Sequence, residues 1–230
     1  MNLLDLIFPK RCLECGRIGK YFCDRCSSKI RFIVTRETIC PICARSAIDG
    51  RTHPYCQTSY TLDGLTSFFH YDVIIRKAVK AIKYRFVSDL AKEFIGLIPR
   101  SSLNQVTNLP TNQDTIVIPV PLHPSRLRFR GFNQAELLGS LIAKKLNVPT
   151  NTGILKRVRS TIPQVEMKDR NKRLVNMEKA FSIQPLTINH KPLTISLFDD
   201  VFTTGATMRS AASVLKRAGV NNIWGITIAR

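Results

Sequence analysis

The chain has 230 residues, of which 44% are hydrophobic and 22% are charged, so it can bury the cores of one medium and one small domain and is not an intrinsically disordered chain. Its 35 Lys and Arg residues outnumber its 16 Asp and Glu residues and give a net charge of +19. This excess favours a polyanionic partner, namely nucleic acid, an acidic membrane surface or a phosphorylated ligand, over a basic surface that is only solvated.

The sequence holds no run of 18 apolar residues, so we expect no membrane-spanning segment. Residues 1–12 are apolar, but they carry Asp5 and lack the charged start and the small-residue cleavage site of a secretory signal. We therefore expect a cytoplasmic protein, either free or at the inner face of the membrane. In that reducing compartment the seven cysteines need an explanation other than disulfides.

All seven cysteines lie in the first quarter of the chain, as two C-x-x-C pairs followed by one C-x-x-C and one H-x-x-C pair. Each pair can place two ligands on one side of a metal, and two pairs close a tetrahedral zinc site with no open position. Redox-active thiols are the alternative, which so many tandem pairs disfavour. We predict one to two structural zinc ions, with these ligands: Cys12, Cys15, Cys23 and Cys26, then Cys40, Cys43, His53 and Cys56.

A break near residues 57–64 separates this metal module, residues 1–60, from a larger domain, residues 61–230. In the larger domain strands alternate with amphipathic helices, which predicts a mostly parallel α/β sheet with flanking helices. Strands are expected over 65–72, 114–122, 194–198 and 222–229. Helices are expected over 73–86, 88–100, 133–148 and 208–219, and a polar loop over 101–113.

In the first of these helices, Ile74, Ala78 and Ile82 share one face. The lysines at positions 77, 80 and 83 follow a similar spacing, and we interpret them as a solvated stripe.

The turn after the third strand, in the segment ISLFDDVFTTGATMRSA (195–211), begins with two adjacent aspartates. Ligands of parallel sheets bind beyond the carboxyl ends of strands. Gly205 permits backbone conformations closed to other residues, and successive N–H groups at a helix N-terminus form a nest for a phosphate monoester.

The two carboxylates can accept hydrogen bonds from sugar hydroxyls. The segment therefore predicts a ribose 5-phosphate site rather than an ordinary strand–turn–helix. Its residues are Asp199, Asp200, Val201, Phe202, Thr203, Thr204, Gly205, Ala206 and Thr207.

Two basic segments offer further anion contacts. Three arginines alternate in the first, so that in an extended chain they would project to one side: Arg126, Arg128 and Arg130. With His123 nearby, they could hold a pyrophosphate, or a nucleic acid backbone with Phe129 or Phe132 stacked on a base. The second segment, 156–173, is either a solvated charge run or a mobile lid whose ligand-facing residues are Gln164, Arg170 and Asn171.

The segment LFDDVFTTGAT (197–207) resembles the phosphoribosyl pyrophosphate (PRPP) signature of type I phosphoribosyltransferases. Residues 118–138, 159–181 and 217–230 resemble the ComF/GntX family, and the resemblance covers nearly the whole chain. It departs at His53, where a cysteine is expected and zinc tolerates the change, and at Phe198, where a smaller aliphatic residue is common and we expect local repacking.

The resemblance implies a double zinc ribbon joined to a type I phosphoribosyltransferase domain, with PRPP and magnesium bound at one sheet edge. It also implies a role in natural transformation, in which the protein handles incoming single-stranded DNA beside other DNA-uptake or recombination proteins. The alternatives are an active phosphoribosyltransferase with an unknown acceptor, in which Asp199 and Asp200 are catalytic, and a regulator that senses PRPP.

Because no residue of the cysteine pairs belongs to the α/β sheet, we expect loss of either zinc to leave the turn at residues 195–211 intact.

Overall fold

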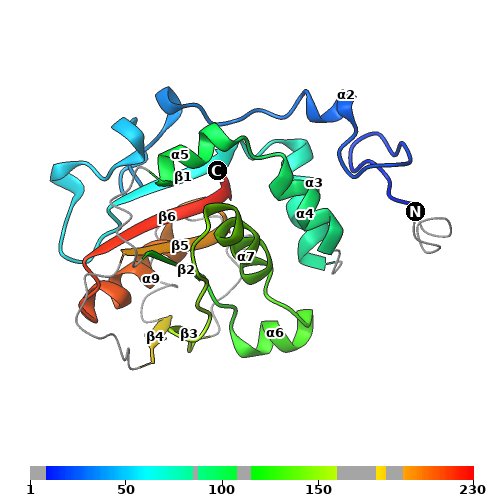
Figure 1. The fold of residues 1–230 in the computed structure, drawn as a ribbon. Helices are drawn as coiled ribbons and strands as arrows, with labels where there is room; N and C mark the ends of the chain where they lie inside the picture. The colour runs from blue at the N-terminus through cyan, green and yellow to red at the C-terminus, as the bar shows by residue number, and fades with distance from the viewer. Residues whose placement is uncertain (1–8, 85–87, 108–114, 160–179, 185–193) are drawn as a thin grey trace.

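A four-stranded parallel sheet forms the centre of the computed structural model, which describes residues 9–84, 88–107, 115–159, 180–184 and 194–230 (Figure 1). Its strand order is β1-β6-β5-β2. The strands are β1 (Gly64–Phe69), β2 (Thr115–Pro119), β5 (Thr194–Val201) and β6 (Asn222–Ala229). The predicted mostly parallel α/β sheet is confirmed, and β5 continues past the predicted end at residue 198, through both aspartates, to Val201.

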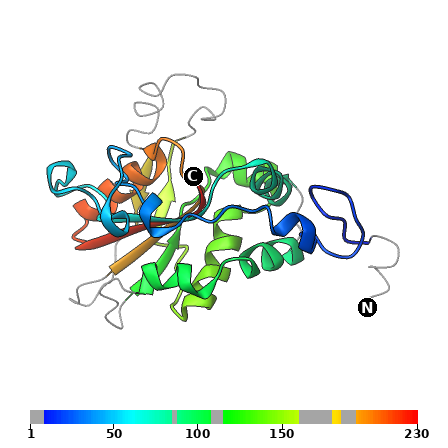
Figure 2. The same cartoon turned by 90° about the horizontal axis from the view of Figure 1, so that it is seen from above.

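Helices cover both faces of this sheet. The helices α3 (Val73–Tyr84), α4 (Ser88–Gly96) and α7 (Gln134–Leu146) share one hydrophobic core with Phe198 of β5, whereas α9 (Ala206–Arg217) shares a second core with Ile195 and Leu197. Figure 2 shows the orange α9 and the light green α7 on opposite sides of the strands. The alternation along β5 is the period of two that a strand buried on both faces requires.

Phe198 itself is fully buried, and a Cβ atom at Gly139 of α7 would lie 3.1 Å from its ring. The absence of a side chain at position 139 therefore provides room for the Phe198 ring.

Two predicted conformations are wrong. Residues 101–107, expected in a loop, belong to α5 (Arg100–Thr107), because Leu103 is buried in the core and anchors the turn that begins beside Pro99. The arginines at 126–130, expected to alternate on an extended chain, lie on α6 (Pro124–Arg130).

Helix α6 starts at a proline, is capped by the His123 side chain and ends at Gly131 in the left-handed region, φ +80°. At about 100° per residue, Arg126 and Arg130 then lie on one side of the helix and Arg128 on the other. The three arginines do not form a single row.

The structure also contains a short antiparallel pair that was not predicted, β3 (Leu155–Arg157) and β4 (Phe181–Ile183). Within the described ranges, no helix combines the length and the apolar composition that crossing a bilayer requires.

Residues 9–60 contain little regular structure: α2 (Asp24–Ser27) and three 3-10 turns, η1 (Thr35–Glu37), η2 (Ile48–Gly50) and η3 (Pro54–Cys56). The two halves contact different parts of the α/β sheet. Phe22 of the first half stacks on Phe94 of α4 with ring centroids 5.5 Å apart, whereas Pro41 and Ile42 of the second contact α9. The boundary at residue 60 stays a prediction.

Candidate functional site

The predicted metal ligands converge into two clusters of four side chains, each with all ligand atoms within 4.8 Å of one another. The first cluster is Cys12, Cys15, Cys23 and Cys26, and the second cluster is Cys40, Cys43, His53 and Cys56. In the first, the Sγ atoms of Cys15 and Cys23 are 3.6 Å apart. Tetrahedral zinc with bonds of about 2.3 Å to sulfur separates two sulfurs by about 3.8 Å. Both clusters therefore have the donor set and the size of a closed structural zinc site.

His53 is oriented as a metal ligand. Its Nε2 lies 2.9 Å from the carbonyl oxygen of Ser46, which can only accept, so this nitrogen carries the proton. The other nitrogen, Nδ1, lies 3.3 Å from the Cys43 sulfur, with the Tyr55 hydroxyl also within 3.1 Å. The lone pair of Nδ1 is thus directed into the second cluster.

The thiol pKa values show how each cluster attracts a cation. A backbone N–H from Arg45 lowers the pKa of Cys43 to about 6, while burial and the neighbouring thiols raise that of Cys56 to about 11. In the first cluster, burial opposes ionisation of Cys12, but backbone N–H donors outweigh it and lower its pKa to about 6; burial raises that of Cys26 to about 12. The thiolates of Cys12 and Cys43 therefore form readily, and a central cation would favour ionisation of Cys26 and Cys56 as well.

The two aspartates at the end of β5 lie in different surroundings. Asp200 is 5% exposed, and one of its carboxylate oxygens lies 2.7 Å from Nζ of Lys83, at the end of α3. Asp199 is half-buried, and burial, with the Asp200 charge second, raises its pKa to about 7. One carboxylate is therefore buried in an ion pair with a lysine, whereas the other, Asp199, can exchange a proton near neutral pH.

Lys83 corrects the sequence interpretation of a solvated lysine stripe. Its side chain is only 26% exposed. Burial opposes its charge, but the Asp200 carboxylate outweighs burial, and the pKa of Lys83 is raised. Because α3 ends beside the carboxyl edge of β5, its last lysine belongs to the aspartate site.

Two arginines add positive charge to this edge. Arg157 of β3 is buried, with its guanidinium 5.6 Å from the centre of the Phe181 ring. Burial and the charge of Arg126 lower its pKa to about 10, whereas the Asp199 carboxylate acts in the opposite direction. The carboxylates and cations of the site therefore come from β5, α3, β3 and α6, which are far apart in the sequence.

The turn between β5 and α9 has the conformation that its glycine was expected to allow. Gly205 lies in the left-handed region, φ +71°, directly before the first residue of α9. A Cβ atom there would lie 2.5 Å from Cζ of the buried Phe202 ring. The turn thus places the helix N-terminus, with its backbone N–H groups, at the end of the strand that carries the two aspartates.

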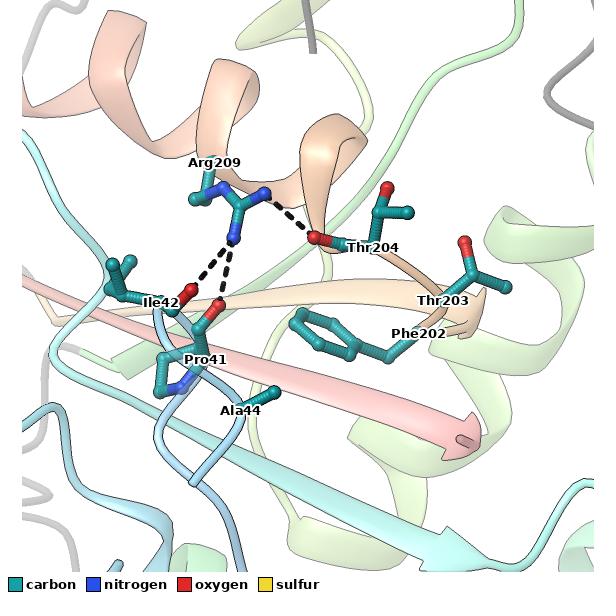
Figure 3. Close-up of a pocket in the computed structure, with 7 residues that line it drawn as sticks. All are labelled: Pro41, Ile42, Ala44, Phe202, Thr203, Thr204 and Arg209. Atoms are coloured by element: carbon teal, nitrogen blue, oxygen red, sulfur yellow. Dashed lines mark hydrogen bonds between the residues drawn. The ribbon is translucent and has the colours of Figure 1, made fainter. Parts of the chain in front are cut away.

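A pocket of about 170 Å³ lies between this turn and the second cluster, lined by Pro41, Ile42, Ala44, Phe202, Thr203, Thr204 and Arg209. Figure 3 shows the Phe202 ring directed toward Ala44, and the hydroxyls of Thr203 and Thr204 directed away from Pro41. One face of the turn therefore contacts the cysteine-rich segment, and the opposite face carries the hydroxyl groups.

Comparison with known proteins agrees with both parts of the molecule. Residues 3–58 match the double zinc ribbon domain. The chain is 36% identical to Competence protein F of Haemophilus influenzae over 115 residues, about half of each protein. It is 26% identical to Competence protein ComFC of Bacillus subtilis over 215 residues, 86% of this chain and 78% of that protein.

The double zinc ribbon match and the similarity to these two competence proteins support the resemblance to the ComF family. The chain is also similar to DNA utilization protein YhgH of Escherichia coli, strain K12, with 26% identity over 203 residues, 86% of this chain and 85% of that protein. These longer alignments extend well beyond the double zinc ribbon into the α/β part of the chain.

The remaining predicted site residues are placed as follows. His123 uses Nδ1 to cap α6 through the backbone of Ser125. Arg130 lies over the Tyr84 ring at 5.7 Å, Arg128 is exposed, and Phe129 is 89% exposed. The predicted lid residues lie outside the described residues: Gln164, Arg170 and Asn171.

Sequence reasoning missed the roles of Lys83, Arg157 and Arg209. Lys83 was interpreted as part of a solvated stripe, and Arg157 as part of a segment that is either a solvated charge run or a mobile lid. The local sequence of neither indicates burial beside a carboxylate. Arg209 stands in a helix that was predicted correctly, but its partners are backbone carbonyls of Pro41 and Ile42, which no side-chain pattern reveals.

Proposed function

We propose that this protein binds PRPP, or another ribose 5-phosphate ligand, at residues 199–207 and handles single-stranded DNA in natural transformation. The observation that carries the proposal is the turn itself. Two adjacent aspartates lie at the end of β5, one of them paired with Lys83, and a left-handed glycine then precedes α9 at the carboxyl edge of a parallel sheet. The names of the relatives, competence and DNA utilization proteins, support the DNA role.

The ligand would be divided between the two halves of the turn. The backbone N–H groups at the start of α9, with the hydroxyls of Thr203, Thr204 and Thr207, would hold the 5-phosphate. The carboxylates of Asp199 and Asp200 would accept hydrogen bonds from the ribose hydroxyls. Magnesium would accompany the pyrophosphate, whose oxygens are its preferred ligands, and neutralise its charge.

In this proposal residues 1–60 form the zinc-ribbon module and residues 61–230 the phosphoribosyltransferase-like domain. The zinc ions are structural, because neither four-ligand cluster leaves an open coordination position. The protein would act on DNA after its entry into the cytoplasm, beside other DNA-uptake or recombination proteins.

Helix α6 is the described element best suited to single-stranded DNA. Phe129 projects a largely exposed ring, and Arg126, Arg128 and Arg130 distribute positive charge around the helix. Stacking of bases on an exposed aromatic ring, with cations along the backbone, is how sequence-tolerant proteins bind single strands. The net charge of +19 strengthens attraction to any polyanion.

Titration of the protein with PRPP–Mg²⁺ and with a short single-stranded DNA, separately and then in competition, tests both halves of the proposal. We expect each ligand to bind. Displacement of DNA by saturating PRPP–Mg²⁺ would place both at one edge, whereas simultaneous binding would place the DNA on the outer surface or the ribbon. No affinity for single strands at low salt would reject DNA handling, and no affinity for PRPP would reject the ribose-phosphate site.

Transfer of the phosphoribosyl group to an acceptor is the second candidate function, and the raised pKa of Asp199, about 7, favours it. A carboxyl group with that pKa can take a proton from an attacking nucleophile near neutral pH. Pyrophosphate release from PRPP, measured with nucleobases and other nucleophiles as acceptors, tests this activity. Binding of PRPP without release under all conditions would instead favour a PRPP-sensing regulator.

A further inference from the structure

Arg209 joins the second cluster to the turn that begins α9. Its Nη1 donates to the carbonyl oxygens of Pro41 and Ile42, at 3.1 and 3.4 Å, and its Nη2 donates to the carbonyl oxygen of Thr204 at 2.7 Å (Figure 3). Pro41 and Ile42 are the two residues between Cys40 and Cys43. One guanidinium therefore spans a metal-binding turn and a predicted phosphate-binding turn that lie about 160 residues apart in the sequence.

The position of the two carbonyl acceptors depends on the metal-binding turn. The fully buried Cys40 donates its N–H to the Arg45 carbonyl, and Ala44, in the left-handed region at φ +60°, donates to the Cys40 carbonyl. This tight turn directs the sulfurs inward and the carbonyls of its two middle residues toward α9. A segment with so little core of its own is held in shape chiefly by its metal.

Arg209 also binds the backbone of the turn that precedes α9. Its backbone N–H donates to the Gly205 carbonyl, and its Nη1 lies 3.4 Å from the point that a Cβ at Gly205 would occupy. The hydroxyls of Thr203 and Thr204 are directed away from Pro41 (Figure 3). Arg209 therefore contacts the backbone of the turn on the face opposite to the hydroxyl groups.

We propose that Arg209 is a positioning residue through which the second cluster fixes the conformation of the phosphate-binding turn. The inference rests on the proposed ribose-phosphate site, and it changes our expectation that loss of either zinc leaves the turn intact. That expectation still applies to the first cluster, whose surroundings contact α3 and α4 through Glu14 and Phe22. The two metal sites would thus have unequal effects on ligand binding.

The coupling is tested by calorimetric titration of the full chain with ribose 5-phosphate, with zinc content measured on each sample. Arg209→Met should keep both zinc ions and lose about 5- to 150-fold in affinity, the usual range for coupled sites. Arg209→Lys, which retains one cationic donor group, should recover part of the loss. Arg217→Met, at the exposed end of the same helix, is the matched control and should bind like wild type.

The metal end is tested in the same way with Cys43→Ser, and Cys15→Ser of the first cluster is the control. Cys43→Ser should lose zinc and affinity together, whereas Cys15→Ser should lose zinc and keep its affinity. Equal loss of affinity in the two variants would overturn the proposed coupling, because it would reflect general damage to the cysteine-rich segment.

Hydrogen exchange of the amides of residues 202–206 in the ligand-free protein tests the link without any ligand. Arg209→Met and Cys43→Ser should both speed this exchange, and Cys15→Ser should not. Unchanged exchange in Arg209→Met would overturn the inference while leaving the ribose-phosphate proposal standing. If the wild-type protein binds no ribose 5-phosphate but both variants still exchange faster, the ligand assignment is rejected and the coupling between the second cluster and the turn is supported.

Discussion

Replacing Gly205 with alanine tests the turn most directly, because the structure gives two separate costs for the new methyl group. The first is conformational: an L-residue in the left-handed region, here φ +71°, costs about 1–2 kcal/mol. The second is steric: the Cβ would lie 2.5 Å from Cζ and 2.8 Å from Cε2 of the buried Phe202 ring. Adding one carbon to a packed core costs about 1–3 kcal/mol.

Together these costs amount to roughly 2–5 kcal/mol. These costs can lower either the free energy of unfolding or the ligand affinity. If the turn of the variant keeps its conformation, the strain lowers the free energy of unfolding. If the turn relaxes, the ligand must restore the original conformation, and binding is weaker. The losses in unfolding and in ribose 5-phosphate binding should therefore sum to that range, and if all of it fell on binding, Kd would rise roughly 30- to 4,000-fold.

Urea denaturation and calorimetric titration measure the two losses on the same samples. Gly219→Ala is the matched control, because Gly219 also has a positive φ, +91°, but nothing lies within 4 Å of its missing Cβ. It should lose only about 1–2 kcal/mol of stability and no affinity. Phe202→Leu removes the two clashing ring atoms, so the double variant with Gly205→Ala should recover the steric part in a double-mutant cycle.

Two results would refute this reasoning. Equal destabilisation by the Gly205 and Gly219 substitutions would mean that the Phe202 contact does not constrain the turn. Unchanged ribose 5-phosphate affinity in Gly205→Ala, with the stability loss present, would mean that the ligand binds elsewhere.

Metal analysis of protein purified without added zinc should give one to two equivalents per chain, and a metal-free folded protein with all thiols reactive would contradict the zinc prediction. The pKa of Asp199 is raised to about 7 in the folded protein, above the unfolded value of about 3.9, so folding favours the protonated carboxyl group. The free energy of unfolding should therefore fall as the pH rises between these two values. In urea titrations, Asp199→Asn should show a flatter dependence of this free energy on pH. The ribose hydroxyls need an ionised acceptor, so PRPP affinity should rise through pH 7 in wild type more than in Asp199→Asn, and this variant should weaken PRPP more than inorganic phosphate; equal losses would contradict the division of the site. Single-stranded DNA affinity should fall with salt at a log–log slope of about −0.7 per contacted phosphate, and Arg128→Ala should flatten the slope by roughly that amount if it makes one contact. Phe129→Ala should cost about 1–3 kcal/mol of DNA binding with little change in slope, measured by fluorescence anisotropy, whereas an unaltered affinity would exclude base stacking at this ring.

Local pattern was sufficient for much of the fold and for the metal ligands. The four strands of the sheet follow from short runs of apolar and β-branched residues, because a parallel strand covered on both faces buries nearly all of its side chains. The helices α7 and α9 follow from amphipathic segments placed between these strands. The two ligand sets follow from spacing, because a C-x-x-C turn brings both sulfurs to one metal whatever surrounds it. The same holds for Gly205, whose place between a strand and a helix predicts its left-handed conformation.

Helix α6 could have been predicted from the sequence but was not. Pro124 and Gly131 are standard signals for the start and end of a helix, but the alternating arginines favoured an extended reading. Segment α5 is a different case, because its polar sequence becomes helical through burial of Leu103 against residues distant in the chain.

The partners of the site were decided by tertiary structure alone. Lys83 finds Asp200, 117 residues later, only because α3 ends where β5 ends. Arg209 finds the carbonyl of Pro41 across 168 residues only because the second metal-binding turn packs against the start of α9. Neither contact can be recognised from the local sequence, because a lysine or arginine that faces water has the same sequence surroundings as one that binds a distant carboxylate or carbonyl. Burying such a charge costs free energy, and this cost is offset only when the fold has brought the partner within hydrogen-bonding distance.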